Sequence, residues 1–432
     1  MIKFTEEQLK AINIANEYLD GKINKDYITI SGQAGTGKTT ILREIIKNFN
    51  YRIIIGGAVS HAASRVLNNS IQIPTMSLAK MLNKKRKVDN FGNIKFETSI
   101  YGEIPITKAD IIIIDECSMI DKEELNNILK YRKANSKLIF VGDMAQLPPI
   151  NNENNKISPT FDNTIIELNK VMRSQYPLNI VNDYFRKIII DNILNNKSIP
   201  HSILSRKIEF KNEQINDKGI FTVRNINNFI KIFKHHYKNN NPNSCKIIAY
   251  KNKTIDYYNK AIRESLFGDN LKHSFVEGDM ILSQSNYFID DFNMIQNNTF
   301  FTVVKVKGGI QDKIPCYYLD LINEFGNTYK DIPVIDIPKG YKIYKSIKEK
   351  LKKEAEKNKK AIFWKKYYNF IESFAYFTFG YAITSHKAQG QTIENVIVFA
   401  QEIKNVMPIM SLEKLQSIYV ATSRASHNIY IY

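Results

Sequence analysis

The stretch GQAGTGKT at residues 32–39 constrains the fold more than any other part of the sequence. It lies between the apolar run YITI and the segment ILREIIKNF, in which apolar residues recur at helical spacing. Glycines in such a loop let backbone N–H groups turn inward around phosphate oxygens, and the positive end of the next helix strengthens the attraction. A strand, a glycine-rich loop and a helix in this order predict a phosphate-binding loop in an α/β fold.

The polar side chains at the end of this loop indicate which ligand it binds. Lys38 can reach the β- and γ-phosphates of a nucleoside triphosphate, and the hydroxyl of Thr39 can bind Mg²⁺. We therefore expect ATP and Mg²⁺ as cofactors, with Lys38 in a catalytic role. The nucleotide-binding residues expected beside them are Gly35, Thr36, Gly37 and Thr40.

A second motif, IIIIDECSM at residues 111–119, places two carboxylates at the end of an apolar run. An uninterrupted β-branched run is typical of a strand buried on both faces of a parallel sheet, and ligands bind at the carboxyl end of such strands. We expect Asp115 to hold Mg²⁺ through water and Glu116 to act as general base on the attacking water. The alternative is a strand followed by an acidic helix cap.

The run KLIFVGDMAQLPPI at residues 137–150 predicts a third strand. Gln146 follows it, where it could sense the γ-phosphate or the attacking water; Gln146 and Asp143 could equally be ordinary turn residues. Another strand is expected at RIII, residues 52–55. The alternation of strands and helices predicts a doubly wound sheet with right-handed crossovers.

Composition limits the class of protein. The chain has 432 residues, enough for two to four domains at about 100–200 residues each. Its net charge of +18 favours a polyanionic partner, nucleic acid before membrane, although biased composition is an alternative reason. No apolar run has the length of a membrane span, the first residues lack a secretory signal pattern, and three scattered cysteines fit a reducing compartment. We expect a cytoplasmic protein of a bacterial cell or a phage-infected host.

A longer series of motifs contains those above: FTEEQ, GQAGTGKTT, AVSHAAS, TMSLAK, IIDECSM, GDMAQLPPI, LNKVMRS, SHKAQGQT and YVATSRA. In this order the series resembles superfamily 1 helicases of subfamily 1B, of the RecD and Dda type, and the layout resembles small phage helicases. The resemblance implies two RecA-like domains, with a β-hairpin insertion in the first and an SH3-like β-barrel plus helical insertion in the second. The expected limits are 1–175 with the hairpin at 83–106, then 176–275 and 376–432 with the insertion at 276–375.

The resemblance also implies further nucleotide contacts. The glutamine that matches Gln8 reads the adenine edge, although Thr5 and Gln8 also form the sequence of a helix capping box. Arg173 and Arg424 resemble arginines that clasp the γ-phosphate, and a planar guanidinium pairs well with phosphate oxygens. Gly390 and Gln391 are expected to lie towards the nucleotide.

Single-stranded DNA is the partner that the resemblance implies. A serine, Ser77, stands where the family commonly has histidine, which leaves the base contact at this position open. The segment from 83 to 99 reads as a β-hairpin, and it lies where the family carries the pin that splits the duplex. Phe96 and Phe91 are the candidates to stack on the parting base pair; the alternative is an ordinary surface hairpin whose aromatic side chains pack on their own domain. The expected DNA contacts are Ser60, His61, Thr75, Phe96, Asn252, Thr384 and His386.

The implied activity is that of an ATP-dependent DNA helicase that moves 5′ to 3′ on single-stranded DNA and unwinds duplex DNA. Single-stranded DNA and its junctions with duplex are the expected partners, with replication or single-strand-binding proteins as further candidates and a monomer as the expected state. Two alternatives stay open: a superfamily 1 RNA helicase, and a nucleotide-gated binding module that does not unwind. The basic segment at 341–375 could line the DNA path or be a solvated face.

Overall fold

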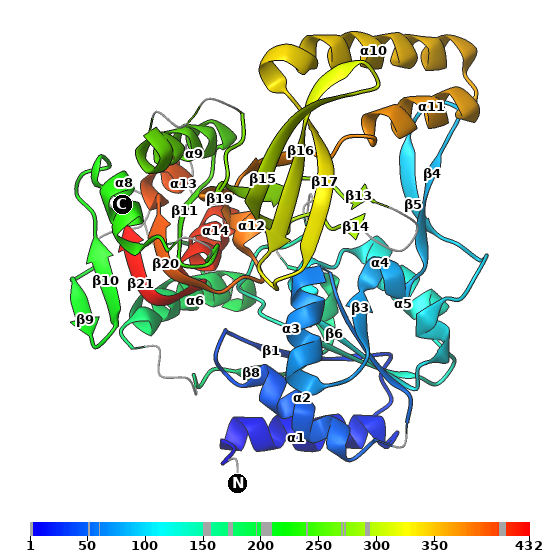
Figure 1. Cartoon of the computed structure of the whole chain (residues 1–432). Helices are drawn as coiled ribbons and strands as arrows, with labels where there is room; N and C mark the ends of the chain where they lie inside the picture. Colours follow the sequence, from blue (N-terminus) through cyan, green and yellow to red (C-terminus); the bar gives the residue numbers. More distant parts are fainter. Residues whose placement is uncertain are drawn as a thin grey trace.

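The structure is a computed structural model that describes residues 3–50, 52–59, 61–149, 157–171, 176–195, 197–199, 210–238, 241–268, 271, 274–289, 294–405 and 412–432, with the backbone alone at 61, 62, 65, 66, 404 and 405. Three sheets organise this part of the chain (Figure 1). Two of them are mostly parallel and carry the motifs, and the third is antiparallel.

The first sheet has six parallel strands in the order β3-β2-β6-β7-β1-β8. Ile111 and Ile113 of the central strand point to the side of α1, α2 and α3, whereas Ile112 and Ile114 point to the side of α4 and α5. The isoleucine run is therefore buried on both faces, as predicted. The elements are α1 Glu6–Leu19, β1 Ile28–Gly32, α2 Lys38–Lys47, β2 Ile54–Ala58, α3 His61–Ile71, β3 Thr75–Ser77, α4 Leu78–Met81, β6 Ile111–Asp115, α5 Lys122–Tyr131, β7 Lys137–Gly142 and β8 Thr164–Leu168.

The second sheet also has six strands, in the order β19-β11-β20-β21-β10-β9, and only β9 runs antiparallel to its neighbour. Its strands come from two distant parts of the sequence, on either side of the third sheet. The elements are α6 Leu178–Asn195, β9 Glu213–Ile215, β10 Lys218–Thr222, α8 Asn228–His236, β11 Cys245–Ala249, α9 Asn252–Phe267, β19 Ala382–Thr384, α12 Ser385–Ala388, β20 Ile393–Val398, α13 Ala400–Asn405, α14 Leu412–Thr422 and β21 Ala425–Ile431.

The third sheet is antiparallel, in the order β17-β16-β15-β12-β18, with its own apolar core. Its strands are β12 Met280–Ser283, β15 Phe300–Gln311, β16 Ile314–Asn323, β17 Thr328–Ile335 and β18 Phe377–Phe379, and the short strands β13 Tyr287–Phe288 and β14 Met294–Ile295 pair with each other. The domain limits and the SH3-like assignment given above stay predictions.

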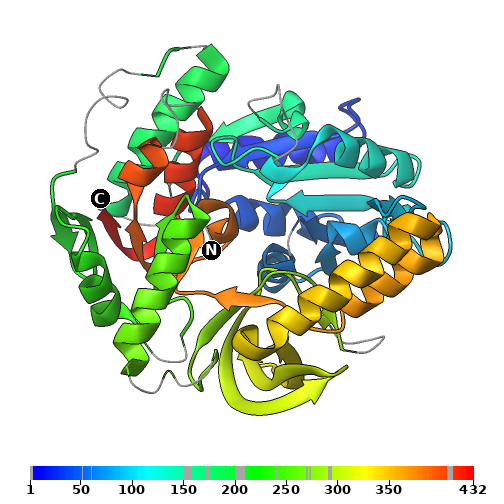
Figure 2. The same cartoon turned by 90° about the horizontal axis from the view of Figure 1, so that it is seen from above.

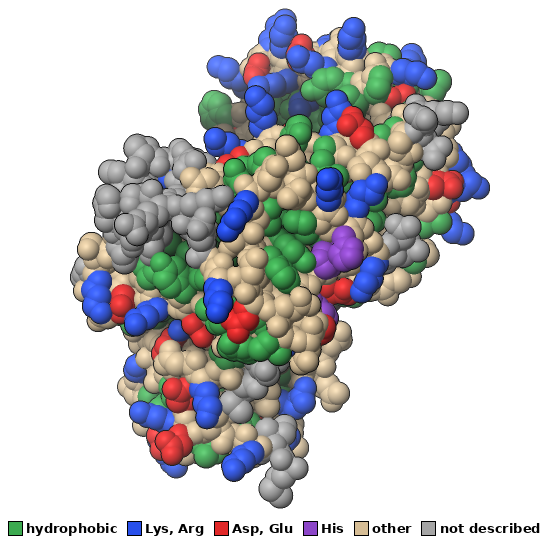
Figure 3. Space-filling model, turned by 90° about the vertical axis from the view of Figure 1, so that its left-hand side faces the viewer, with side chains coloured by type: hydrophobic (Ala, Val, Ile, Leu, Met, Phe, Trp, Pro, Cys, Tyr) green, Lys and Arg blue, Asp and Glu red, His purple; other side chains and the backbone are tan. Residues whose placement is uncertain are grey.

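Between β17 and β18 the chain forms two helices, α10 Ile337–Asn358 and α11 Ala361–Ile371, which run side by side (Figure 2). Lys and Arg side chains gather at the end of the molecule where α10 lies (Figure 3). None of the described helices, α10 included, is both long and apolar enough to cross a membrane.

A hairpin formed by β4 Lys84–Val88 and β5 Ile94–Thr98 projects from the first half of the chain towards α11 (Figure 1). Here the first half means the described residues up to 171, which build the first sheet and this hairpin, and the second half means those from 176 onward. Its turn is held by Asp89, whose carboxylate accepts hydrogen bonds from the backbone N–H groups of Phe91 and Asn93, each at 2.8 Å. Asx side chains commonly hold turns in this way.

The tip of the hairpin is docked on α11. The indole N–H of Trp364 donates to the backbone carbonyl of Asn90 at 3.1 Å, and the hydroxyl of Tyr368 donates to that of Gly92 at 2.7 Å. Gly92 has φ +86°, and a Cβ atom there would lie 2.7 Å from the indole ring. Glycine is therefore required both by the backbone conformation and by the close approach of the ring.

The only tryptophan of the chain reports on this docking. Replacing Gly92→Ala forces a methyl group into the Trp364 ring, so we expect the indole to become solvated and its fluorescence emission to move to longer wavelength. The control is Gly102→Ala, at φ +90°, where the new Cβ meets only the amide of Asn83 at 3.8 Å. Both changes carry a similar backbone strain of about 1 kcal/mol. Identical emission spectra for the two variants would contradict the docking.

A buried lysine joins the second and third sheets. Lys246 of β11 is fully buried; its ammonium donates to the carbonyl of Gly380 at 3.1 Å and lies 3.6 Å from the centroid of the Phe300 ring. Burial lowers the pKa of Lys246 to about 7. Its ring and carbonyl contacts offset part of the cost of burying the charge.

Replacing Lys246→Met is expected to raise the melting temperature at pH 7, because a buried charge gives way to an apolar side chain of similar length. Between the folded pKa of about 7 and an unfolded value of about 10.4, the unfolded chain binds more protons, so wild-type stability rises with pH across this window. The advantage of the variant should therefore shrink from pH 7 towards pH 10 in thermal melts. A constant advantage over this range would contradict the assignment.

Candidate nucleotide-binding site

The phosphate-binding loop links the end of β1 to the start of α2. Gly35 and Gly37 have φ angles of +82° and +85°, which glycine adopts without strain. The Nζ atom of Lys38 donates to the backbone carbonyls of Gly32 at 2.6 Å and Gln33 at 3.0 Å, so the ammonium lies over the loop. Thr39 and Thr40 follow in the first turn of α2, both half-buried.

Gln8 of α1 fastens that helix to the loop. It forms the capping box with Thr5, since Gln8 Oε1 accepts from the N–H of Thr5 at 3.0 Å and Thr5 Oγ1 accepts from the N–H of Gln8 at 3.2 Å. Gln8 Nε2 also donates to the carbonyl of Thr36 at 2.9 Å, and a Cβ atom on Gly37 would lie 2.5 Å from it. The capping interpretation is confirmed, and the adenine contact stays a prediction.

The carboxylate pair lies at the carboxyl end of β6. Asp115 is the last residue of the strand, and Glu116 follows with φ +54°, its N–H donating to Asp115 Oδ1 at 2.8 Å. Burial raises the pKa of both carboxyls, and the charge of Asp115 raises that of Glu116 further. Lys38 opposes both shifts, and Arg424 opposes the shift of Glu116. Arg424, from the other end of the chain, is thus close enough to act electrostatically on Glu116.

Buried amides connect Gln146 to the second half of the chain. Gln389 Nε2 lies 3.1 Å from both Gln146 Oε1 and Ser118 Oγ. Gln416 Nε2 donates to the backbone carbonyl of Gln146 at 3.0 Å. The motif after β7 therefore lies at the contact between the two halves.

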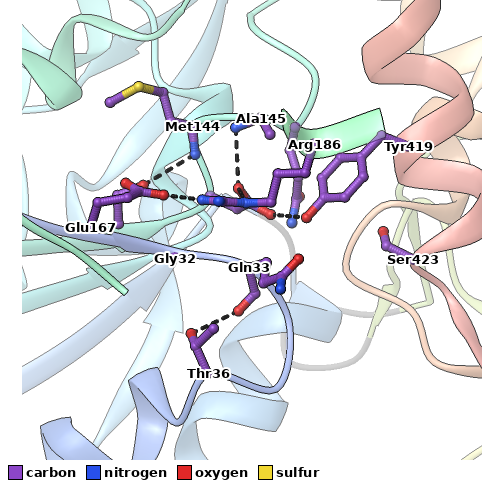
Figure 4. Close-up of polar contacts among 12 residues, drawn as sticks. Gly32, Gln33, Thr36, Met144, Ala145, Glu167, Arg186, Tyr419 and Ser423 are labelled. Atoms are coloured by element: carbon purple, nitrogen blue, oxygen red, sulfur yellow. Dashed lines mark hydrogen bonds and ion pairs between the residues drawn. The ribbon is translucent and has the colours of Figure 1, made fainter. Parts of the chain in front are cut away.

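A second buried network surrounds Asp143 (Figure 4). Tyr419 of α14 donates its hydroxyl to Asp143 Oδ2 at 2.6 Å, and the N–H of Ala145 donates to Oδ1 at 3.1 Å. Arg186 of α6 lies with Nε 3.5 Å from Asp143 Oδ1 and also pairs with Glu167 of β8. Burial raises the pKa of Glu167, and the Arg186 guanidinium opposes this. Two helices of the second half are thus held at the edge of the first sheet.

The predicted nucleotide residues of the second half lie together. Gly390 has φ +77°, and Gln391 Nε2 donates to the carbonyl of Lys387 at 2.6 Å. Arg424 is buried; its Nε donates to the carbonyl of Val420 at 3.2 Å, and Nη1 lies 3.5 Å from the carbonyl of Gln391.

The residues predicted to contact DNA lie at several places on the described chain. Thr75 of β3 donates its hydroxyl to the carbonyl of Ser64 at 2.8 Å, and Ser77 caps α4, with Oγ accepting from the N–H of Lys80 at 3.4 Å. Ser60, Arg173 and the side chain of His61 lie outside the described residues.

In the second half, Thr384 caps α12, and its hydroxyl accepts from the N–H of Lys387 at 3.3 Å. Burial lowers the pKa of the neighbouring His386, which favours the neutral imidazole. Asn252 is the exposed first residue of α9, and Phe96 of β5 is 61% exposed. Their contacts with DNA stay predictions.

Comparison with known proteins matches both ends of the chain to described families. Residues 6–181 match an AAA domain, and residues 379–432 match a UvrD-like helicase C-terminal domain. An uncharacterized protein of Acanthamoeba polyphaga mimivirus is 26% identical, over 98% of each chain. The ATP-dependent DNA helicase Dda of Enterobacteria phage T4 is 28% identical over 66% of this chain and 62% of its own length.

This chain is a homologue of the superfamily 1B helicases. Its fold agrees with that assignment: a crystal structure of Pif1 helicase from Bacteroides in complex with ADP-AlF3 and single-stranded DNA superposes with a TM-score of 0.50. The two proteins are 17% identical, over 100% of this chain and 92% of the Pif1 chain.

Four side chains of this superfamily 1B homologue were missed as site residues in the sequence. Gln389 and Tyr419 stand inside quoted motifs, SHKAQGQT and YVATSRA, without a role assigned to them. The sequence does indicate that Arg186 is buried, because it occupies the same face of α6 as the buried Asn182 and Ile189. A charged residue on the apolar stripe of a helix indicates a buried partner. The fourth, Gln416, carries no comparable signal.

Replacing Tyr419→Phe removes one buried hydrogen bond to Asp143 and leaves the ring in place. We expect a loss of about 1 kcal/mol in stability and a lower rate of ATP hydrolysis, because α14 also carries the turn to Arg424. The control is Tyr18→Phe, which also removes a buried hydroxyl, one that bonds Asp26 and Leu138 within the first half. Steady-state ATPase assays on both variants test this; equal rates would show that the Tyr419 contact has no role beyond stability.

Proposed function

We propose that this chain is an ATP-dependent DNA helicase, which couples ATP hydrolysis to 5′-to-3′ movement along single-stranded DNA and separates the duplex ahead of it. The observation that carries the proposal is the meeting of the two halves beside the phosphate-binding loop, through Gln389, Gln416, Tyr419 and Arg424. A nucleotide bound there contacts both halves, so its hydrolysis can change their spacing. The similar Dda protein is named an ATP-dependent DNA helicase, and the similar Pif1 structure holds ADP-AlF3 and single-stranded DNA; both support this activity. The direction of movement is the one implied by the resemblance to subfamily 1B.

Each residue around the phosphate-binding loop has a separate role in ATP hydrolysis. Lys38 binds the β- and γ-phosphates, and Gln146 orients the attacking water. Glu116 accepts the proton of that water, and the raised pKa of its buried carboxyl makes it a better base. Arg173 and Arg424 stabilise the charge that develops on the γ-phosphate.

Thr39 and Asp115 fit a Mg²⁺ ion by the chemistry of their donor atoms. Mg²⁺ prefers oxygen ligands and keeps several waters, so two protein ligands with phosphate oxygens complete its shell. When bound, the ion neutralises phosphate charge. Asp115 would then stay ionised despite its burial, because the positive ion opposes the rise in its pKa. Within the described residues no cluster of three or more His, Cys, Asp or Glu side chains forms a separate metal site.

The DNA strand that the protein follows lies across both halves. Ser60, His61 and Thr75 hold its phosphates on the first half, while Asn252, Thr384 and His386 hold them on the second. Such contacts fix position without reading sequence. A neutral His386 donates one N–H, which suits a phosphate contact. The domains have the limits predicted above, and one chain supplies every group, so the protein acts as a monomer on single-stranded DNA and its junctions with duplex.

Replacing Lys38→Ala is expected to lower ATP turnover by about 100-fold or more, because the phosphate charge loses its main partner. Salt-sensitive binding of single-stranded DNA should remain. The control is Lys47→Ala on the same helix, whose exposed ammonium pairs with Glu44. The measurement is ATP turnover with single-stranded DNA, with single-stranded RNA and with neither.

Each alternative has its own outcome in this assay. Stimulation by RNA alone would identify an RNA helicase, whose contacts need a 2′-hydroxyl. Slow turnover that responds to neither polymer would identify a nucleotide-gated binding module. Full turnover in Lys38→Ala would overturn the assignment of the loop.

A further inference from the structure

A groove of about 490 Å³ lies where the hairpin meets α11, at the end of the molecule away from α1 and α2 (Figure 1). The hairpin supplies one wall and α11 the other, so the groove exists only because the hairpin tip is docked on Trp364. It is lined by Arg86, Val88, Ala361, Ile362, Lys365, Tyr368 and Asn369. Neither the nucleotide site nor the predicted DNA contacts of the two parallel sheets use this groove.

The lining combines cationic and apolar groups. Lys365 is exposed at the side of the groove, and Ile362 is 62% exposed. The guanidinium of Arg86 lies 4.1 Å from the centroid of the Tyr368 ring and pairs with Glu372. A flat, apolar group with an attached anion would match this arrangement, since apolar surface and an aromatic ring lie beside positive charge.

The hairpin extends the apolar surface. Phe96 is paired directly with Arg86 across the two strands, so both side chains lie on the same face of the hairpin. Ile94 is paired with Val88 in the same way. Phe96 is 61% and Ile94 41% exposed, so the face that borders the groove offers apolar side chains to a ligand.

The surrounding charge favours a polyanion. Residues 84–98 and 359–372 contain nine lysine or arginine side chains against three acidic ones. The acidic side chains already have partners, because Asp89 holds the hairpin turn, Glu97 pairs with Lys87 and Glu372 pairs with Arg86. An excess of this kind attracts phosphate groups and makes binding sensitive to salt.

We propose that this groove binds single-stranded DNA, and that its occupant is the strand displaced from the duplex. A phosphate contacts Lys365 while bases lie over Ile362 and Phe96. The proposal rests on the helicase function above, because only an unwinding protein produces a displaced strand.

The position of the groove favours the displaced strand over the strand that the protein follows. Thr75, a predicted contact of the strand that the protein follows, lies on β3, which leads through α4 into the first residue of β4. The groove lies beside Arg86 and Val88, towards the other end of β4, roughly 7 to 13 Å further along at about 3.3 Å per residue. The base of the hairpin thus follows the predicted Thr75 contact along the chain, whereas the groove lies against the part of β4 that is docked on α11, as expected if the hairpin keeps the strands apart.

Site-specific crosslinking tests the occupant. The three cysteines of the chain are buried, so Asn369→Cys, at an exposed position in the groove, introduces a thiol that an azidophenacyl reagent can label. The substrate is a DNA fork with a 5′ tail on one strand and a 3′ tail on the other. Light should join the label to the 3′-tailed strand, which a 5′-to-3′ helicase displaces. The control is Lys47→Cys on α2, a position that is also exposed and lies at the opposite end of the molecule (Figure 1).

Crosslinks to the 5′-tailed strand, to both strands equally, or no more frequent than those of Lys47→Cys would each overturn the proposal. Unwinding of the same fork by the wild-type chain is measured in parallel. If the wild type unwinds the fork and the crosslink falls elsewhere, the groove assignment fails alone. If the wild type does not unwind any fork, the helicase function fails.

A charge reversal gives a second, independent readout. Lys365→Glu should weaken binding to the fork with a 3′ tail by about fivefold and lower the slope of log affinity against log salt by about one. Binding to a duplex with the 5′ tail alone and turnover with single-stranded DNA should stay unchanged. Lys366→Glu, the neighbouring exposed lysine outside the groove lining, is the matched control. An equal effect in Lys366→Glu, or an equal loss on the substrate without a 3′ tail, would overturn the proposal.

Discussion

The buried ion pair between Arg186 and Asp143 is the interaction on which the arrangement of the two halves depends. Arg186 contacts two carboxylates, those of Asp143 and Glu167, at the edge of the first sheet, and Tyr419 completes the partners of Asp143. Loss of the arginine would leave the buried Asp143 carboxylate and the half-buried Glu167 carboxylate without their shared cation, which is more costly than the loss of a surface pair. This pair therefore stabilises the observed contact of the halves beside the phosphate-binding loop.

Buried polar side chains contribute to the contact between the halves, and such contacts suit a protein whose halves move. Amides of Gln389 and Gln416 reach Gln146 directly, and each such bond contributes about 1 kcal/mol net. Interfaces of this kind can be broken and formed again more easily than a continuous apolar core. The hairpin belongs to the first half but is docked through Trp364 on a helix inserted in the second. A change in the spacing of the halves would therefore act on the hairpin as well as on the nucleotide.

Local patterns made the first sheet and its loop predictable from the sequence. Four consecutive isoleucines predicted the central strand, because both faces of a strand in a parallel sheet are buried. All four isoleucine side chains are buried in the structure. The capping box of Thr5 and Gln8 was equally local. The docking of Trp364 on Gly92 was not, since it joins two distant segments through a glycine that reads as an ordinary turn residue. Arg186 and Tyr419 likewise gain their roles only when α6 and α14 meet the first sheet, which no local pattern specifies.

Strand separation on tailed duplexes tests the central claim, that a nucleotide held between the two halves drives directed movement on DNA. The wild-type chain is incubated with ATP and a duplex that carries either a 5′ or a 3′ single-stranded tail. We expect separation of the 5′-tailed duplex alone. Separation from the 3′ tail alone, or of neither duplex while ATP is hydrolysed, would contradict it.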